Sequence, residues 1–326
     1  MASVPLSILD LAPVRQDETP RDSFTASVAL ARLAEQAGYR RIWYAEHHNM
    51  KSIASSATSV LIAHVAAHTE SIRLGSGGVM LPNHSPLVIA EQFGTLEALH
   101  PGRIDLGLGR APGSDQATMY AIRRDPASSD RFPEDVQELQ AYLAGESLVP
   151  GVSAHPGSGS RVPLYILGSS LFGAQLAALL GLPFAFASHF APQALHQAVS
   201  IYRERFTPSA QLDAPHVIAG VNVIASESED DAAEQLQAAK RSRVRTLARP
   251  GRRLTDEEAD IVLSSPEGRQ IESMVRYSAV GRPDEVRDYL EGFAKDADAD
   301  ELIVALQSPA SDKRLRSAEL LADAWF

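Results

Sequence analysis

RIWYAEHHN, residues 41–49, is the stretch of sequence that decides the fold of this chain. Its first half, Arg41 to Ala45, is mostly apolar and aromatic and predicts a short buried strand, entered soon after the helix-ending Gly38. The strand runs without a turn residue into a carboxylate and two imidazoles, Glu46 to His48. Barrel and doubly wound α/β enzymes place their chemistry at the carboxyl ends of such strands. The stretch therefore predicts an α/β scaffold with a reactive site at one end of its sheet.

Strands and helices alternate along the whole 326-residue chain. Apolar runs bounded by turn residues predict eight strands, at residues 4–11, 39–45, 72–81, 103–110, 163–168, 183–190, 216–225 and 301–307. This alternation indicates a parallel sheet, and the count favours a single (β/α)8 TIM barrel domain over residues 1–326 rather than an open doubly wound sheet. The barrel is then expected to carry irregular insertions at about 111–129, 146–162 and 249–280.

The composition excludes several classes of protein. The formal net charge of −11 argues against a nucleic-acid partner, which needs clustered lysine and arginine. The densest basic run, Lys240 to Arg253, is interpreted as a solvated helix face. The chain has no cysteine, so disulfides and cysteine-ligated metal sites are excluded. No apolar run approaches the roughly 20 residues of a membrane span, and Met1 begins no signal peptide. We expect a cytoplasmic protein with neither a nucleic-acid nor a membrane partner.

Glu46, His47 and His48 allow three interpretations: metal ligands, an acid–base pair, or a polar loop without chemistry. Because neighbouring residues of a strand point to opposite faces, His47 and His48 do not both face the barrel axis while the strand persists. A zinc site needs a further ligand from another strand end, for which Asp10 and His189 are candidates. We favour chemistry over a plain loop, and an acid–base role over a metal.

The sequence Gly75-Ser76-Gly77-Gly78 interrupts a strand that is otherwise apolar. Glycine inside a strand marks a bulge or the close approach of a ligand to the backbone. The Gly77-Gly78 pair has no Cβ atoms and suits a flat ring lying against the chain; a bend of the barrel is the alternative.

Two neighbouring strand ends suit an anion. In GLGRAPG, residues 107–113, a dinucleotide-binding loop is rejected because Pro112 interrupts it and the third glycine is one place late. Arg110 is instead a candidate anion-binding fork, with a structural salt bridge as the alternative. The turn GSS, residues 168–170, offers backbone N–H groups and two hydroxyls at a helix N-terminus, which suit a phosphate, with a simple N-cap as the alternative.

Several stretches, taken in order, resemble the bacterial luciferase-like, flavin-dependent monooxygenase superfamily. They are WYAEHHN (43–49), GSGGVMLPNHSP (75–86), AEQFGTLEALHPGRIDLGLGR (90–110) and YILGSSLFGAQLAALLGLPFAFASHF (165–190). The likeness runs from Val4 to about Tyr202, and it is closer to the small single-chain bacterial members than to the light-emitting heterodimer.

The resemblance implies FMN bound at the carboxyl-terminal mouth of the barrel. His47 matches the catalytic histidine, and Gly77-Gly78 matches a non-proline cis peptide beneath the flavin ring. The implied cofactor-binding residues are Ser76, Gly77, Gly78, Arg110, Gly168, Ser169 and Ser170. Candidates for the substrate pocket are Asp10, His48, Asn49 and His189, and no metal site is implied. Ser169 stands where the light-emitting subunit carries a carboxylate and Gly109 where it has a cysteine; these departures bear on light emission, and flavin binding is little affected.

The function that the resemblance implies is an FMN-dependent monooxygenase. Reduced FMN, delivered by a separate NAD(P)H:flavin reductase, reacts with O2 to give a C4a-peroxyflavin that oxidises a small organic substrate, while His47 acts as an acid–base group. The resemblance also implies a homodimer. Three alternatives stay open: an F420-dependent hydride-transfer enzyme in the same fold, a flavin-binding protein without turnover, and a metal-dependent hydrolase that uses His47 or His48 with Asp10.

Overall fold

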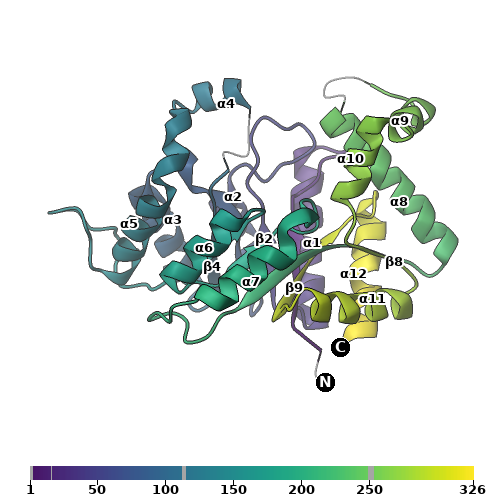
Figure 1. The fold of residues 1–326 in the computed structure, drawn as a ribbon. Coiled ribbons are helices and arrows are strands. Elements are labelled where there is room, and N and C mark those ends of the chain that lie inside the picture. Colours follow the sequence, from purple (N-terminus) through teal and green to yellow (C-terminus); the bar gives the residue numbers. More distant parts are fainter. Residues whose placement is uncertain (1–2, 16, 112–114, 249–252) are drawn as a thin grey trace.

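A closed barrel of parallel strands forms the centre of the molecule, with helices wrapped around it (Figure 1). The structure, a computed structural model, describes residues 3–15, 17–111, 115–248 and 253–326. The barrel strands are β1 (Leu6–Asp10), β2 (Arg41–Tyr44), β3 (Arg73–Met80), β4 (Ile104–Gly109), β5 (Leu164–Gly168), β6 (Phe184–Phe186), β7 (Val217–Ala225) and β9 (Glu301–Leu306). Each strand pairs in parallel with the next, and β9 closes the ring between β7 and β1. The predicted (β/α)8 TIM barrel is confirmed.

The helices cover the outside of the barrel. In chain order they are α1 (Pro20–Ala37), α2 (Thr58–Ala66), α3 (Pro86–Leu99), α4 (Gln116–Ala121), α5 (Phe132–Ala144), α6 (Leu171–Leu180), α7 (Leu195–Arg205), α8 (Glu229–Arg243), α9 (Asp256–Leu263), α10 (Pro266–Met274), α11 (Pro283–Asp296) and α12 (Ser311–Trp325). Short 3-10 helices are η1 (Leu81–Asn83), η2 (Pro126–Arg131) and η3 (Pro192–Ala194), and a π-helix, η4 (Val244–Ala248), continues α8. Within the described ranges, no helix combines the length and the apolar character needed to cross a bilayer.

Local sequence sets where these helices begin and end, as α1 illustrates. Thr19 accepts a hydrogen bond from the backbone N–H of Asp22, and the Asp22 carboxylate accepts one from the backbone N–H of Thr19, which forms a capping box. Pro20 occupies the first helical position, where its missing N–H costs nothing. Gly38 ends the helix in the left-handed conformation that glycine adopts without a steric penalty.

The insertions follow the prediction only in part. Residues 146–162 form no helix or strand, as predicted. The irregular structure predicted for 111–129 and 249–280 was wrong, because α4 and part of η2 lie in the first, and α9 and α10 in the second. These helices are too short for a hydrophobic period to stand out, and only their N-caps, such as Thr255 and Ser265, could have indicated them. Within these stretches, residues 112–114 and 249–252 lie outside the described residues.

A ninth strand, β8 (Ser278–Gly281), was also missed within the predicted insertion. It pairs with the outer end of β7, from Asn222 to Ala225, and with no other strand of the described chain. The sheet therefore continues past the barrel on this side, where α8, α9 and α10 lie together (Figure 1).

A buried ion network closes the barrel at the amino-terminal ends of its strands. Arg41 of β2 lies at the centre: its Nη1 is 2.8 Å from Asp105 Oδ2 on β4, and its Nε is 3.0 Å from Glu301 Oε1 on β9. None of these three side chains is more than 1% exposed. Arg41 also donates to the hydroxyl of Tyr165 on β5 at 2.7 Å. One guanidinium thus joins strands from opposite parts of the ring.

Apolar side chains fill the barrel above this network. They are Leu9, Trp43, Ala45, Tyr165, Ala185, Ile218 and Ile303, with Leu11 and Leu167 packed against them. Because side chains of a strand alternate between its two faces, the inward position of Arg41 carries Trp43 and Ala45 inward as well. The same alternation, continued past the end of β2, directs His47 to the mouth, the end of the barrel where the strands have their carboxyl ends.

We expect Arg41→Gln to lower the free energy of unfolding by about 3 kcal/mol or more, because it removes the one fully buried cation that pairs with both the Asp105 and the Glu301 carboxylates within the described chain. The matched control is Arg287→Gln, which breaks an exposed pair with Glu291 and should cost about 0.5 kcal/mol or less. Urea unfolding of both variants measures the difference. Equal losses for the two variants would show that the network does not hold the barrel together.

Candidate active site

The loops that follow the barrel strands bring the candidate residues to the mouth. Glu46, His47, His48 and Asn49 follow β2; Gly77 and Gly78 lie within β3; Arg110 follows β4; Ser169 and Ser170 follow β5; His189 follows β6. Parallel strands of one barrel end at the same side, so residues far apart in the sequence converge there. Their hydrogen bonds and ion pairs distinguish the side chains that already have partners within the protein from those that do not.

Both carboxylate oxygens of Glu46 accept hydrogen bonds from groups at the mouth, and these bonds stabilise the loops there. Its Oε1 accepts hydrogen bonds from His48 Nε2 at 2.7 Å and His84 Nε2 at 2.8 Å, and its Oε2 accepts one from the backbone N–H of Met80 at 3.1 Å. Burial alone would raise the pKa of Glu46, but these hydrogen bonds outweigh it and lower the pKa below its ordinary value. The same contact with Glu46 raises the pKa of His48. Glu46 is therefore a carboxylate anchor for β2 and β3, not a group that faces a substrate.

Glu46, His48 and His84 are also the described residues that come together with the spacing of metal ligands. Both imidazoles direct Nε2 at the same carboxylate oxygen, so hydrogen bonds account for the arrangement. The ligand set considered from the sequence is not assembled, because Asp10 is committed elsewhere. Asp10 accepts from Arg314 Nη1 at 2.7 Å and from Ser27 Oγ at 2.6 Å, inside the protein. These are the contacts of a structural ion pair.

His47 and His189 differ from that cluster, because each has a buried Nδ1 atom without a hydrogen-bond partner. Burial lowers the pKa of His47 below its ordinary value. The pKa of His189 is lowered to about 4, mainly by burial and to a smaller extent by the nearby charges of Arg243 and His47. Both imidazoles are therefore neutral at pH 7, and they lie close enough to influence each other. A buried polar atom without a partner at the mouth of a barrel is a site where a ligand can supply the missing bond.

The glycines of β3 allow close packing around the mouth. The peptide bond between Gly77 and Gly78 is cis, as the resemblance implies. A Cβ atom on Gly77 would lie 2.7 Å from Leu9 Cδ1, and one on Gly78 would lie 2.8 Å from the backbone oxygen of Gly107. Ser76 is buried, and its hydroxyl donates to the same Gly107 oxygen at 2.8 Å. The register between β3 and β4 shifts at this point, which supports the bend, and the close contacts here are with Leu9 and Gly107; the approach of a flat ring to Gly77 and Gly78 stays a prediction.

The ends of β4 and β5 form a positively polarised corner. The guanidinium of Arg110 lies over the ring of Phe172 at 4.1 Å from its centre, and it forms no ion pair with a described residue. Phe172 belongs to the first turn of α6, whose N-cap is Ser170. The Ser170 side chain makes no capping hydrogen bond, and both Ser169 and Ser170 are exposed. The first-turn N–H groups of α6 and the Arg110 cation thus face one corner, an arrangement that suits a phosphate.

Asn49 makes its contact between two loops and not inside the barrel. It is exposed, adopts a left-handed backbone conformation and donates from Nδ2 to Asp115 Oδ2 at 3.0 Å. Asp115 is the N-cap of α4. This contact ties the loop after β2 to the helix after β4.

Sequence reasoning missed three residues that the structure places at the mouth. His84 stands two positions before the helix-opening Pro86, where the sequence gives no sign of a partner. Asn222 lies within an apolar strand, and a buried amide there was a signal of a polar neighbour. Arg243 was hidden in the basic run that was interpreted as solvated. The structure corrects that interpretation for Arg243, which is partly buried and contacts Asn222.

Comparison with known proteins agrees with this geometry. A sequence model of the family described as "Luciferase-like monooxygenase" matches residues 4–300. A protein of Escherichia coli (strain K12) with the same name is 49% identical over 324 residues, which cover 98% of this chain and 97% of that protein. The N-acetyl-S-alkylcysteine monooxygenase of Bacillus subtilis (strain 168) is 42% identical over 187 residues, 56% of each chain.

Solved structures share the fold along the whole chain. Apo-MsnO8 is 39% identical with a TM-score of 0.89, covering 99% of this chain and 98% of that one. The oxygenating constituent of 3,6-diketocamphane monooxygenase from Pseudomonas putida, a type II Baeyer–Villiger monooxygenase solved in complex with FMN, has a TM-score of 0.74. It covers 99% of this chain and 97% of its own, but at 17% identity the likeness is one of fold alone.

We expect His48 to stabilise the fold in a pH-dependent way. Its pKa is higher in the folded chain than the ordinary value of 6.5, so the stabilisation is complete below pH 6.5 and is lost as the pH rises through the raised folded-state pKa. The difference in unfolding free energy between the wild-type chain and His48→Gln should therefore be larger at pH 6 than at pH 9. In Glu46→Gln, NMR titration should show the pKa of His48 falling. A His48 pKa that does not respond to Glu46→Gln would contradict the cluster.

Proposed function

This chain belongs to the luciferase-like monooxygenase family, and from that premise we propose that it is an FMN-dependent monooxygenase, which uses reduced flavin and O2 to oxygenate a small organic substrate at the barrel mouth. The observation that carries the proposal is the corner between β4 and β5. There the guanidinium of Arg110 and the uncapped N-terminus of α6 converge from adjacent strands. A cofactor that carries a phosphate on a flexible tail fits this corner, because its ring can then lie across the mouth.

The residues around the mouth fit the rest of a flavin. Arg110, Ser169 and Ser170 would hold the phosphate, and the backbone of Gly77 and Gly78 would lie beneath the ring. Their lack of Cβ atoms lets β3 approach both its neighbours and a flat group closely. When bound in the reduced form, FMN supplies the electrons with which O2 is activated.

His47 is the group that we assign to proton handling. Its imidazole is neutral at pH 7, because burial lowers its pKa, and its Nδ1 has no partner within the described chain. A neutral imidazole with an unpaired nitrogen can accept a hydrogen bond from a group at the mouth, or take up and return its proton. Glu46 does not act with it directly, since its oxygens are occupied by His48, His84 and Met80.

The names of two similar proteins support the finer points. The oxygenating constituent of the diketocamphane enzyme is by its name one component of a larger system, which supports a separate NAD(P)H:flavin reductase as the source of reduced FMN. The N-acetyl-S-alkylcysteine monooxygenase supports small sulfur compounds as substrates, with aldehydes as the second class to assay. We further propose a single-domain homodimer, on the family resemblance.

We expect Arg110→Gln to weaken FMN binding about tenfold or more, because it removes a charged donor to the phosphate, and to leave riboflavin binding unchanged. We expect His47→Ala to lower kcat about 100-fold or more at unchanged FMN affinity, because it removes the proton acceptor. Flavin fluorescence measures affinity, and incorporation of ¹⁸O from ¹⁸O2 measures turnover. Arg131→Gln, which changes an exposed arginine outside the mouth, is the control for Arg110.

Three outcomes would contradict this function. Equal losses of FMN and riboflavin affinity in Arg110→Gln would show that the corner does not hold the phosphate. F420 released from the denatured protein and identified by mass, with turnover that does not need O2, would favour hydride transfer. Tight FMN binding without oxygenation of any aldehyde or thioether would favour a flavin-binding protein without turnover.

A further inference from the structure

Three arginines, Arg241 and Arg243 at the carboxyl end of α8 and Arg245 in the following η4, face different surroundings. Arg241 pairs with Asp260 and Asp256, and Arg245 pairs with Asp256, so both are bound to the carboxylates of α9. Residues four apart lie on the same helix face, whereas Arg243, two positions from each, points the opposite way. Within the described chain, no carboxylate lies within ion-pair distance of Arg243. The fold places acids opposite two of the arginines and none opposite the third.

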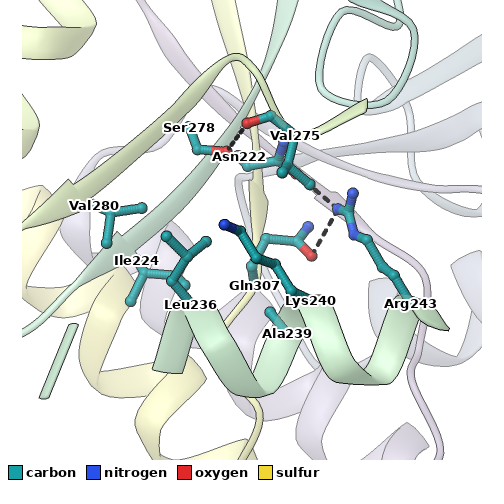
Figure 2. Close-up of a pocket in the computed structure, with 10 residues that line it drawn as sticks. All are labelled: Asn222, Ile224, Leu236, Ala239, Lys240, Arg243, Val275, Ser278, Val280 and Gln307. Carbon is teal, nitrogen blue, oxygen red and sulfur yellow. Dashed lines mark hydrogen bonds between the residues drawn. The ribbon is translucent and has the colours of Figure 1, made fainter. Parts of the chain in front are cut away.

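Arg243 instead contacts two neutral amides. Its Nη2 donates to Asn222 Oδ1 at 3.1 Å and to Gln307 Oε1 at 3.0 Å, as Figure 2 shows at one end of a pocket between α8 and the strands β7 and β8. Both amides are held by other bonds, from Asn222 Nδ2 to the backbone oxygen of His189 and from Gln307 Nε2 to that of Ala305. An arginine has five N–H donors, so Nε and Nη1 keep three that no described residue accepts.

Arg243 lies beside the candidate active site. Asn222 connects it to His189, because Asn222 accepts from Arg243 and donates from Nδ2 to the backbone oxygen of His189 at 2.7 Å. The nearby charges of Arg243 and His47 both lower the pKa of the His189 imidazole. Asn222 is near the end of β7 and Gln307 follows β9, so the guanidinium belongs to the rim of the barrel. Arg110 and the N-terminus of α6 lie at β4 and β5, on the other side of β6. Arg243 is thus separate from the corner that we assign to the phosphate.

The electrostatics of this region leave one charge unbalanced. Burial lowers the pKa of Arg243 to about 10, which still leaves it protonated at pH 7. The neighbouring His47 and His189 are neutral there, because burial lowers the pKa of each. A partly buried cation whose hydrogen-bond partners are neutral amides is costly until an anion pairs with it.

We propose that Arg243 binds a carboxylate group of the substrate, so that the compound oxygenated at this mouth is a small organic acid. This inference rests on the proposed function, since it names the substrate class of the same site. The carboxylate would take the free Nε and Nη1 donors, while Asn222 and Gln307 keep the guanidinium in place through Nη2. The apolar part of the substrate would then extend from Arg243 towards His189 and His47.

Binding of matched acids and amides tests the assignment without turnover. The probes are hexanoate against hexanamide, and N-acetyl-S-methylcysteine against its carboxamide, titrated calorimetrically into the full chain with and without FMN. We expect at least one acid to bind the wild-type chain about tenfold or more tightly than its amide. Arg243→Gln should remove this preference. Gln307→Glu, which keeps the arginine but places a carboxylate beside Nη2, should remove it as well.

Arg245→Gln is the matched control, because it changes an arginine of the same helix end that already has an acidic partner, and the preference should persist in it. Circular dichroism checks that each variant folds, and Gln307→Glu decides the question should Arg243→Gln fail to fold. No acid preference in the wild-type chain, or one that survives in Arg243→Gln or Gln307→Glu, overturns the inference. FMN affinity, measured separately, should be the same in all variants; failure of the wild-type chain to bind FMN overturns the proposed function and leaves the acid–amide comparison valid.

Discussion

The ion network at Arg41 is the constraint on which the rest of the structure depends. A guanidinium inside a barrel is stable only when carboxylates surround it, and Asp105 and Glu301 reach it from β4 and β9. This fixes which face of β2 points inward. A slip of one residue would turn Arg41 out and Ile42 in, and would deprive two buried acids of their contacts with Arg41. The same register brings Trp43 into the apolar layer and His47 to the mouth. The ion pairs of Arg41 at the amino-terminal end of the barrel therefore determine the position of His47 at the other end.

The polar groups at the mouth fall into two kinds, and the difference indicates where a ligand goes. Glu46 and its two histidine partners satisfy one another and hold the loops after β2 and β3 in place. His47 and His189 keep a buried nitrogen without a partner, and Arg243 keeps a charge without a counterion. Native proteins pair nearly all their buried polar groups, so the buried Nδ1 atoms of His47 and His189 are suited to a ligand at the mouth; buried polar atoms without a partner also occur elsewhere in the described chain, as at Tyr44 and Ser160.

Much of the fold and part of the site could be predicted from the sequence. Strong apolar runs and regular spacing predicted every barrel strand, and the glycine pair in β3 was visible because glycine inside a strand is costly. The partners of Glu46 could not be predicted, since His84 reaches it only once β2 and β3 lie side by side. Arg243 looked like its neighbours because a run of charges does not show which member turns inward. The helices of 249–280 escaped because eight or nine residues give too little period to detect.

The ring closes between β7 and β9 without any help from β8, although α8 to α11 and β8 all lie between those two strands in the chain. The segment with β8 and the helices α8 to α11 therefore lies outside the closed ring of strands, in the connection between β7 and β9. Part of this segment still covers the barrel, since α11 packs against β7 and α12 and contributes Val286, Leu290 and Phe293 to the hydrophobic core. Arg243 is carried on this segment, whereas His47 follows β2 and Arg110 follows β4, so the acid preference and the flavin site that we propose rest on separate parts of the fold.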